Sequence, residues 1–427
     1  MRRNLTDRGR GVLIGGIVLT AAGMLLGFVD LVRVGLTCAA LPVICLLLAW
    51  WRRPRLEVRR AVTPTPLEAG QIAAVRVDVR NVGTRRSDVM AAAEQASPGL
   101  PGGARLVLPS LAPQEHTTMS YRVRPARRGL HGLGPLVATR RDPLGLTTGT
   151  ATFGGSSPAL VLPRVHDLSG AAAPRIVGHQ GDDPASVVGG GERDVSLRAY
   201  RLGDDLRQVH WAVTAHRGEL MVRHEAQPAI RRAVLVLDAA ASAWGASPQR
   251  PFDWAVEALA SIAANLARQG FALHLVVGGA EAATTAGGRR DDLSGTDTTG
   301  VLRRLALAEP DAVAVPKRGA VASALYGSAR ELAGSGGLIV VATGDGDPAG
   351  AHDAFGVVRS GSTGLALVAD TAAFAAPVSS ATLGDGPAER LCAFARAGGW
   401  HAGVARPDIG PGEAWAALVG GVGVGDA

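Results

Sequence analysis

Two uncharged, apolar stretches occupy the start of the chain, and each is long enough to cross a membrane. Residues 11–29 carry no charge, and neither do residues 34–51. A membrane-spanning helix needs roughly 17–25 such residues. Only a short connector, residues 30–33, separates the stretches. We therefore expect a transmembrane helical hairpin over residues 1–53, with a cleaved signal peptide as the alternative for the first stretch.

The charges beside these stretches predict an orientation. Arginines flank both outer ends, whereas the connector carries only Arg33, which Asp30 offsets. Because positive residues concentrate on the cytoplasmic side, we expect a two-pass protein of the inner (plasma) membrane with both termini in the cytoplasm. The same arginines supply much of the net charge of +7. No zinc-finger or RNA-recognition motif accompanies them, so we do not expect nucleic acid as a partner.

Residues 54–168 show the alternation typical of half-buried β-strands. Val75, Val77 and Val79 alternate with charged residues, and a second alternating run lies around Tyr121 and Val123. Clusters of Pro, Gly and Ser interrupt the region at short intervals. Short strands with frequent turns predict an all-β, sandwich-like domain, with an irregular spacer as the alternative. Residues 169–230, which open with many Gly, Ala, Pro and Asp residues, are interpreted as a linker and a polar motif.

Residues 231–427 predict an α/β domain with a doubly wound, mostly parallel sheet. Residues 231–238 contain a continuous apolar run that ends in an acid and suits a strand buried on both faces, and apolar residues at helical spacing follow in 251–270. Further strands are expected at 271–279, 337–345, 363–370 and 400–406, and further helices at 301–307, 320–332, 353–358, 388–397 and 413–419. Ligand sites on such sheets lie beyond the carboxyl ends of the strands, where Asp238 and Asp345 are expected.

The half after residue 230 lacks the short motifs of several enzyme classes. It has no Walker A sequence and no G-x-G-x-x-G after a strand, so a nucleotide site is not expected. It has no G-x-S-x-G either, which argues against an α/β-hydrolase. No small-molecule substrate can be identified from these motifs.

The densest polar run of the chain, residues 189–211, permits three interpretations. In an enzyme, Glu192, Asp204 and His210 could act as acid and base, but no nucleophile stands out and nothing fixes their geometry. We therefore do not expect an enzyme or catalytic residues.

The other two interpretations are compatible with each other. In a structural clasp that folds over the sheet and locks it to the β-domain, Arg198 and Arg207 would form forked ion pairs with nearby carboxylates. Tyr200 and Trp211 would bury their rings. In a docking surface, the same residue types would dominate binding to a partner protein.

The polar run resembles a motif of the bacterial "domain of unknown function 58" family. The matching positions are Arg198, Tyr200, Gly203, Asp204, Arg207, Val209, His210 and Trp211. Two shorter segments, 141–146 and 162–164, resemble further elements of that family, although Leu144 stands where the family often has an aromatic residue. The resemblance extends over nearly the whole chain. It implies that the C-terminal half is similar to a von Willebrand factor type A domain.

Type A domains often hold a divalent cation, and the resemblance locates the matching residues here. Their first loop reads Asp-x-Ser-x-Ser, which corresponds to Asp238, Ala240 and Ser242, so one hydroxyl ligand is missing. Asp345 could add a second-sphere carboxylate. Because Mg²⁺ prefers a near-octahedral shell of oxygens, we expect weak or no metal binding, and no cofactor. In the alternative, Asp238 caps the end of its strand and accepts hydrogen bonds from nearby backbone amides.

The resemblance also implies a function. It suggests a membrane-anchored adaptor that works beside a MoxR-type AAA+ ATPase in the assembly or maturation of a protein complex. The alternative is a cell-envelope enzyme or an envelope maturation factor, which a body outside the cytoplasm would favour.

Overall fold

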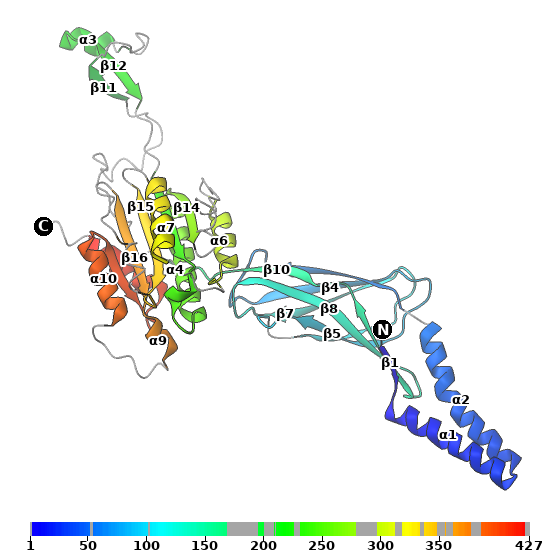
Figure 1. Ribbon diagram of the computed structural model, residues 1–427. Helices are drawn as coiled ribbons and strands as arrows, with labels where there is room; N and C mark the ends of the chain where they lie inside the picture. The colour runs from blue at the N-terminus through cyan, green and yellow to red at the C-terminus, as the bar shows by residue number, and fades with distance from the viewer. Residues whose placement is uncertain are drawn as a thin grey trace. The chain divides into compact units, whose positions relative to one another are not determined.

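The computed structural model describes residues 2–51, 54–100, 103–168, 195–199, 209, 211–225, 231–278, 297–311, 318–333, 337–347, 355, 362–376 and 386–422. The chain divides into two compact units. One unit comprises Met1–Arg164 with Leu302–Leu307, and the other comprises Val165–Val301 with Ala308–Ala427. Figure 1 shows the elements of both.

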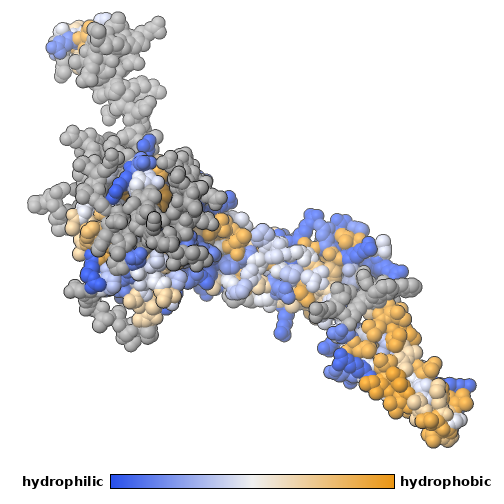
Figure 2. All heavy atoms as spheres, viewed as in Figure 1, coloured by the Kyte–Doolittle hydropathy of each residue, from blue (hydrophilic) through white to orange (hydrophobic). Residues whose placement is uncertain are grey.

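Two helices near the N-terminus are long and apolar enough to cross a membrane, as the sequence predicted. They are α1 (Asp7–Leu26) and α2 (Val29–Trp51), and hydrophobic residues cover much of both in Figure 2. The helices meet through glycines. A Cβ at Gly16 would lie 2.5 Å from the backbone nitrogen of Ala39, and one at Gly35 would lie 2.5 Å from that of Thr20. Small residues allow this close approach of membrane helices.

A strand precedes the first helix, which the sequence did not predict. This strand, β1 (Arg2–Leu5), pairs antiparallel with β9 (Thr147–Phe153) of the following β-rich region. At the start of α1, the Thr6 amide donates to the Leu146 carbonyl at 2.9 Å. The expected hairpin over residues 1–53 therefore begins with residues that belong to the next sheet.

The β-rich region is a sandwich of two sheets. One sheet has the order β1-β9-β8-β10-β3, with β5 on β8 and β6 on β5, and the other has the order β2-β4-β7. The remaining strands are β2 (Leu56–Thr63), β3 (Leu67–Glu68), β4 (Ala73–Asn81), β5 (Met90–Ala96), β6 (Arg105–Leu108), β7 (His116–Val123), β8 (Gly129–Arg141) and β10 (Ser157–Leu162).

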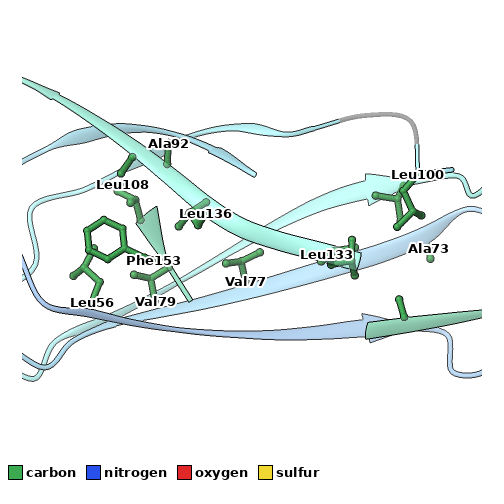
Figure 3. Close-up of a cluster of buried hydrophobic side chains, with 14 of the residues drawn as sticks. Leu56, Ala73, Val77, Val79, Ala92, Leu100, Leu108, Leu133, Leu136 and Phe153 are labelled. Carbon is green, nitrogen blue, oxygen red and sulfur yellow. The ribbon is translucent and has the colours of Figure 1, made fainter. Parts of the chain in front are cut away.

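One hydrophobic core joins the two sheets, which confirms a sandwich and rules out an irregular spacer. Leu133 and Leu136 from one sheet and Val77 and Val79 from the other belong to this cluster, as Figure 3 shows. The alternation predicted from Val75, Val77 and Val79 is present, because β4 alternates between buried and partly or fully exposed positions.

The second unit contains a five-stranded sheet whose strand pairs are all parallel, which confirms the predicted α/β class. The order is β14-β13-β15-β16-β17. The strands are β13 (Arg232–Asp238), β14 (Ala272–Gly278), β15 (Leu338–Gly344), β16 (Thr363–Ala369) and β17 (His401–Ala405). The helices are α4 (Gln249–Arg268), α7 (Arg318–Ala333), α9 (Thr371–Ala375), α10 (Pro387–Ala397) and α11 (Pro411–Val422). The helix α6 (Thr298–Leu307) belongs to both units, because its residues from Leu302 onward are part of the first unit.

The helices of this unit cover the sheet and bury its apolar strands. Residues of α7 and α10 share one core cluster with β13, β15 and β16, while α4 and α11 contact each other. The helix α9 was not predicted from the sequence. Of the helix predicted at 353–358, only Phe355 lies among the described residues.

Candidate functional site

The polar run, residues 189–211, contains the first strand of a small two-stranded sheet and the first residue of the helix between its strands. The strand β11 (Val195–Ala199) pairs antiparallel with β12 (Met221–Glu225), and Arg198 is the register partner of Val222. The helix α3 (Trp211–Arg217) lies between them in sequence. It is tied to β12 because the Met221 amide donates to the Thr214 hydroxyl at 3.0 Å.

The motif residues lie only partly within the described chain. The residues outside the described part of the chain are Glu192, Tyr200, Gly203, Asp204, Arg207 and His210. The ion pairs that a clasp would contain therefore stay predictions. Val209 is buried.

Trp211 corrects the expectation of a buried ring. Its exposed fraction is 66%. Trp211 is the first residue of α3, and the contact of α3 with β12 is made by Thr214 further along the helix. The ring therefore lies on the surface of the described segment, where a large apolar side chain remains available for contact.

A second group of polar residues lies at the carboxyl edge of the parallel sheet. Asp238 ends β13 and Asp345 follows β15, the strand beside it. The chain order reverses here, because β14 lies on one side of β13 and β15 on the other. This reversal is where open α/β sheets bind ligands. Both carboxylates are buried, at 5% and 4% exposed.

Both carboxylates already accept hydrogen bonds from the protein. Asp238 accepts from the Ala240 amide at 3.0 Å and from the Thr343 hydroxyl at 2.8 Å. Asp345 accepts from the amide and the hydroxyl of Thr371, at 3.0 and 2.6 Å. Asp238 thus bonds the backbone just after its strand, in agreement with the capping interpretation. The sequence analysis did not identify Thr343 or Thr371, although Thr343 stands two residues before Asp345 at a strand end.

Ser242 lies in a tight loop that the sheet edge holds in place. The loop contains a short 3₁₀ helix, η3 (Ala241–Trp244), and the Trp244 indole donates to the Asp238 carbonyl at 2.9 Å. A Cβ at Gly346 would lie 2.5 Å from the Ser242 carbonyl oxygen. The structure therefore brings the Ser242 loop beside the segment that carries Asp345.

These residues fit a divalent cation only in part. The edge offers two carboxylates and the hydroxyls of Ser242 and Thr343, whereas Ala240 offers no side-chain oxygen. Within the described residues, no group of three or more His, Cys, Asp or Glu side chains could hold a metal ion. A hard cation prefers six oxygens, so it would have to share carboxylates that Thr343, Thr371 and Ala240 already engage.

The architecture defines a class: a chain with two apolar N-terminal helices, a β-sandwich and an α/β unit with a parallel sheet. Residues 196–331 match the family model described as "Protein of unknown function DUF58". The matched segment includes α3, β12, the strand that ends at Asp238 and the loop with Ser242. Among curated proteins there is no match.

Solved structures are similar over a quarter of the chain. The CARDB domain of the PF1109 protein from Pyrococcus furiosus, in complex with di-metal ions, is 18% identical over 25% of this chain and 93% of that chain, with a TM-score of 0.18. The putative ApaA protein from Bordetella pertussis is 16% identical over 26% of this chain and 96% of that chain, with a TM-score of 0.20.

Proposed function

We propose that this protein is a membrane-anchored adaptor that uses its family-matched segment to dock a partner protein. The observation that carries this proposal is Trp211, which is 66% exposed on a short helix inside the matched residues. Tryptophan is among the residues that most often dominate protein-protein interfaces, since its large ring loses much apolar surface to water when it is covered. An exposed ring in a chain with two apolar N-terminal helices suits docking beside a membrane.

The finer fold that supports this role is a von Willebrand factor type A-like domain. The parallel sheet and the buried acids at its carboxyl edge are consistent with such a domain, in which a loop like that of Asp238 and Ser242 contacts ligands. Hydroxyls and amides of the protein donate hydrogen bonds to these acids. In this proposal the acids therefore hold the loops at the edge in place, and they bind a metal ion weakly or not at all.

The partner that the family resemblance suggests is a MoxR-type AAA+ ATPase. The adaptor would present a client complex to that ATPase at the cytoplasmic face of the membrane. This proposal requires the body of the protein to lie in the cytoplasm.

The test uses the full chain in detergent and a purified MoxR-type ATPase from the same genome. Replacing Trp211 with Ala should weaken binding by about 30-fold or more, which corresponds to the roughly 2 kcal/mol lost at an interface hot spot. The matched control is Phe394→Ala, an aromatic residue that is 42% exposed outside the matched segment. This control should bind as the wild type does. Equal affinity of the Trp211→Ala variant and the wild type would remove the proposed docking surface.

A further inference from the structure

Two loops of the β-sandwich lie at the end from which the two apolar helices extend. The loop between β8 and β9 is bound to the start of α1, because the Thr6 hydroxyl donates to the Gly145 carbonyl at 2.6 Å. The loop between β4 and β5 is bound to the chain shortly after α2, because the Val82 amide donates to the Arg55 carbonyl at 2.9 Å. Both loops therefore lie beside the helix ends, within one compact unit.

Both loops expose large apolar side chains. The exposed fractions are 54% for Leu144 on the β8–β9 loop, and 43% and 61% for Val82 and Val89 on the β4–β5 loop. Asp88, the neighbour of Val89, pairs with Arg140 near the end of β8 at 2.9 Å. This ion pair brings Val89 to the strand that leads into the Leu144 loop. Exposed apolar residues are ordinary when they are scattered singly, but these three gather at one end of the domain.

The loop that carries Leu144 satisfies its own backbone donors. The amides of Leu144 and Leu146 donate to the Asp142 carboxylate at 2.8 and 3.2 Å, and the Gly145 amide donates to the Asp142 carbonyl at 3.0 Å. Pro143, which is exposed beside Leu144, has no amide hydrogen to satisfy. Unpaired backbone donors are what keeps irregular loops out of lipid. Because the donors at the tip of this loop are paired or absent, the tip can leave water at low cost.

Arginines dominate the surface around these loops and the helix ends. The acids there already have partners within the protein: Asp142 in its own loop, Asp88 in Arg140, and Asp7 in Arg10 at 3.9 Å. The exposed arginines of the two loops and the adjoining segments are Arg8, Arg10, Arg55, Arg85, Arg86 and Arg141. Apolar residues surrounded by basic ones are typical of protein surfaces that bind the interface of an anionic membrane.

We propose that the two loops form a second membrane contact, in which Val82, Val89 and Leu144 enter the headgroup region and the surrounding arginines attract anionic phospholipids. The bilayer is the expected occupant, because the apolar span of α2 ends at Ala49, just before the segment that binds the Val82 loop. A span of this length brings its ends to the headgroups. The inference rests on the membrane anchoring in the proposed function, but it is independent of docking through Trp211. The contact would hold the sandwich against the membrane surface.

Photo-cross-linking of the full chain in vesicles of phosphatidylglycerol and phosphatidylethanolamine tests this contact. The photoreactive residue p-benzoylphenylalanine replaces Leu144 or, as the matched control, Leu130, which is 64% exposed at the opposite end of β8. At about 3.3 Å per residue, Leu130 lies roughly 35 Å along the strand from Arg141. Mass spectrometry should detect about tenfold more lipid adduct at position 144 than at position 130, because burial of a leucine side chain favours the inserted loop. Equal yields would overturn the proposal, as would a cross-linked protein dimer at position 144 in place of a lipid adduct.

A probe within the helices separates this inference from the anchoring on which it rests. Leu36 lies in the apolar span of α2 and is 59% exposed, so the same photoreactive residue at position 36 should capture lipid. Capture at position 36 without capture at position 144 would overturn the loop contact and leave the anchoring of the proposed function intact. No capture at either position would overturn both.

Alkylation of cysteine gives a second measurement without a bulky probe. The native cysteines give little background, since Cys38 and Cys45 lie in the apolar span of α2 and Cys392 is buried. In nanodiscs that contain phosphatidylglycerol, a water-soluble maleimide should label Leu144→Cys about tenfold more slowly than Leu130→Cys, because the interface withdraws the thiol from water. In nanodiscs of phosphatidylcholine alone, this difference should shrink. Equal rates for the two variants in the anionic lipid would overturn the proposal, and a difference of the same size in both lipids would overturn the role of the arginines.

Discussion

At the scale of single residues, the β-sandwich contains an ion pair that the sequence analysis did not anticipate. Arg60 on β2 pairs with Glu94 on β5, and their side chains are 2% and 0% exposed. The pair therefore joins the two sheets through the core, and Arg60 also donates to the Gly155 carbonyl at 2.9 Å. Burial, followed by the charge of Glu94, raises the pKa of the nearby Tyr121 to about 12, against the lowering effect of Arg60. Tyr121 is therefore neutral at physiological pH.

Removal of the cation from this pair should destabilise the sandwich strongly. Arg60→Met leaves the buried Glu94 carboxylate without its partner, which should cost about 3–5 kcal/mol. The matched control is Arg59→Met, since Arg59 pairs with Glu57 at 2.8 Å with 79% and 41% exposure, and such exposed pairs contribute about 0–1 kcal/mol. Thermal unfolding of the full chain in detergent gives the Tm of the Arg60→Met and Arg59→Met variants. A Tm for Arg60→Met no lower than that for Arg59→Met would contradict this account, and the double variant Arg60→Met/Glu94→Leu should recover much of the loss.

A second prediction at this scale concerns the acids at the carboxyl edge. Titration of the protein with Mg²⁺ or Mn²⁺ should show no micromolar binding, because Ala240 supplies no ligand oxygen and Asp238 and Asp345 already accept protein hydrogen bonds. Ala240→Ser should tighten any residual site by restoring one hydroxyl. Isothermal titration calorimetry measures the metal affinity of the wild type and of the Ala240→Ser variant. Micromolar affinity in the wild type that Asp238→Ala abolishes would show this prediction to be wrong.

At the scale of elements, α1 and α2 approach each other closely at a glycine, where a larger side chain would not fit. A Cβ at Gly16 would lie 2.5 Å from the Ala39 backbone nitrogen, whereas one at the neighbouring Gly15 would meet nothing within 4 Å. Gly16→Ala should therefore force the helices apart and cost about 1–3 kcal/mol, as overpacking does. Gly15→Ala is the control and should leave the Tm unchanged or slightly raised, since Ala favours a helix. If the two variants have equal Tm values, the hairpin does not pack through Gly16.

The sequence predicted those elements whose burial gives the apolar residues a regular spacing along the chain. The alternation in β4 and the apolar runs of β13, β15 and β16 follow directly from which faces are buried. The strand β1 could not be predicted, because Arg2–Leu5 has no such pattern and pairs with residues 147–150, far along the chain. The hairpin of β11 and β12 was missed for the same reason, since its partners lie on either side of α3.

The candidate site follows the same rule. Asp238 and Asp345 were predicted at one edge of the sheet because both stand at the ends of apolar runs, where parallel strands end together. The sequence did not predict that the hydroxyls of Thr343 and Thr371 belong to the site, because their hydrogen bonds depend on which strands become neighbours. The exposure of Trp211 was also mispredicted, since residue type alone does not fix which face of a short helix it occupies.

At the scale of the whole molecule, the structure joins the segments on both outer ends of the hairpin to one domain. The strand β1 before α1 lies in one sheet of the sandwich, and β2 after α2 lies in the other. Both sheets share one core. If the two helices cross a membrane, the segment before the hairpin and the sandwich after it must therefore lie on the same side. The connector at Asp30–Arg33 must lie on the opposite side.

The charge distribution then predicts which side that is. Arg8, Arg10 and Arg55 flank the outer ends of the helices, whereas the connector has Arg33 paired with Asp30 at 3.2 Å. Positive residues beside membrane spans favour the cytoplasm, so truncation fusions at residue 60 and a fusion at the C-terminus should both give fluorescent green fluorescent protein and inactive alkaline phosphatase. A fusion in the connector should behave in the opposite way and controls for export of the reporter. Active alkaline phosphatase at residue 60 or at the C-terminus would place that part of the body outside the cytoplasm, beyond reach of a cytoplasmic ATPase, and the adaptor function proposed here would fall with it.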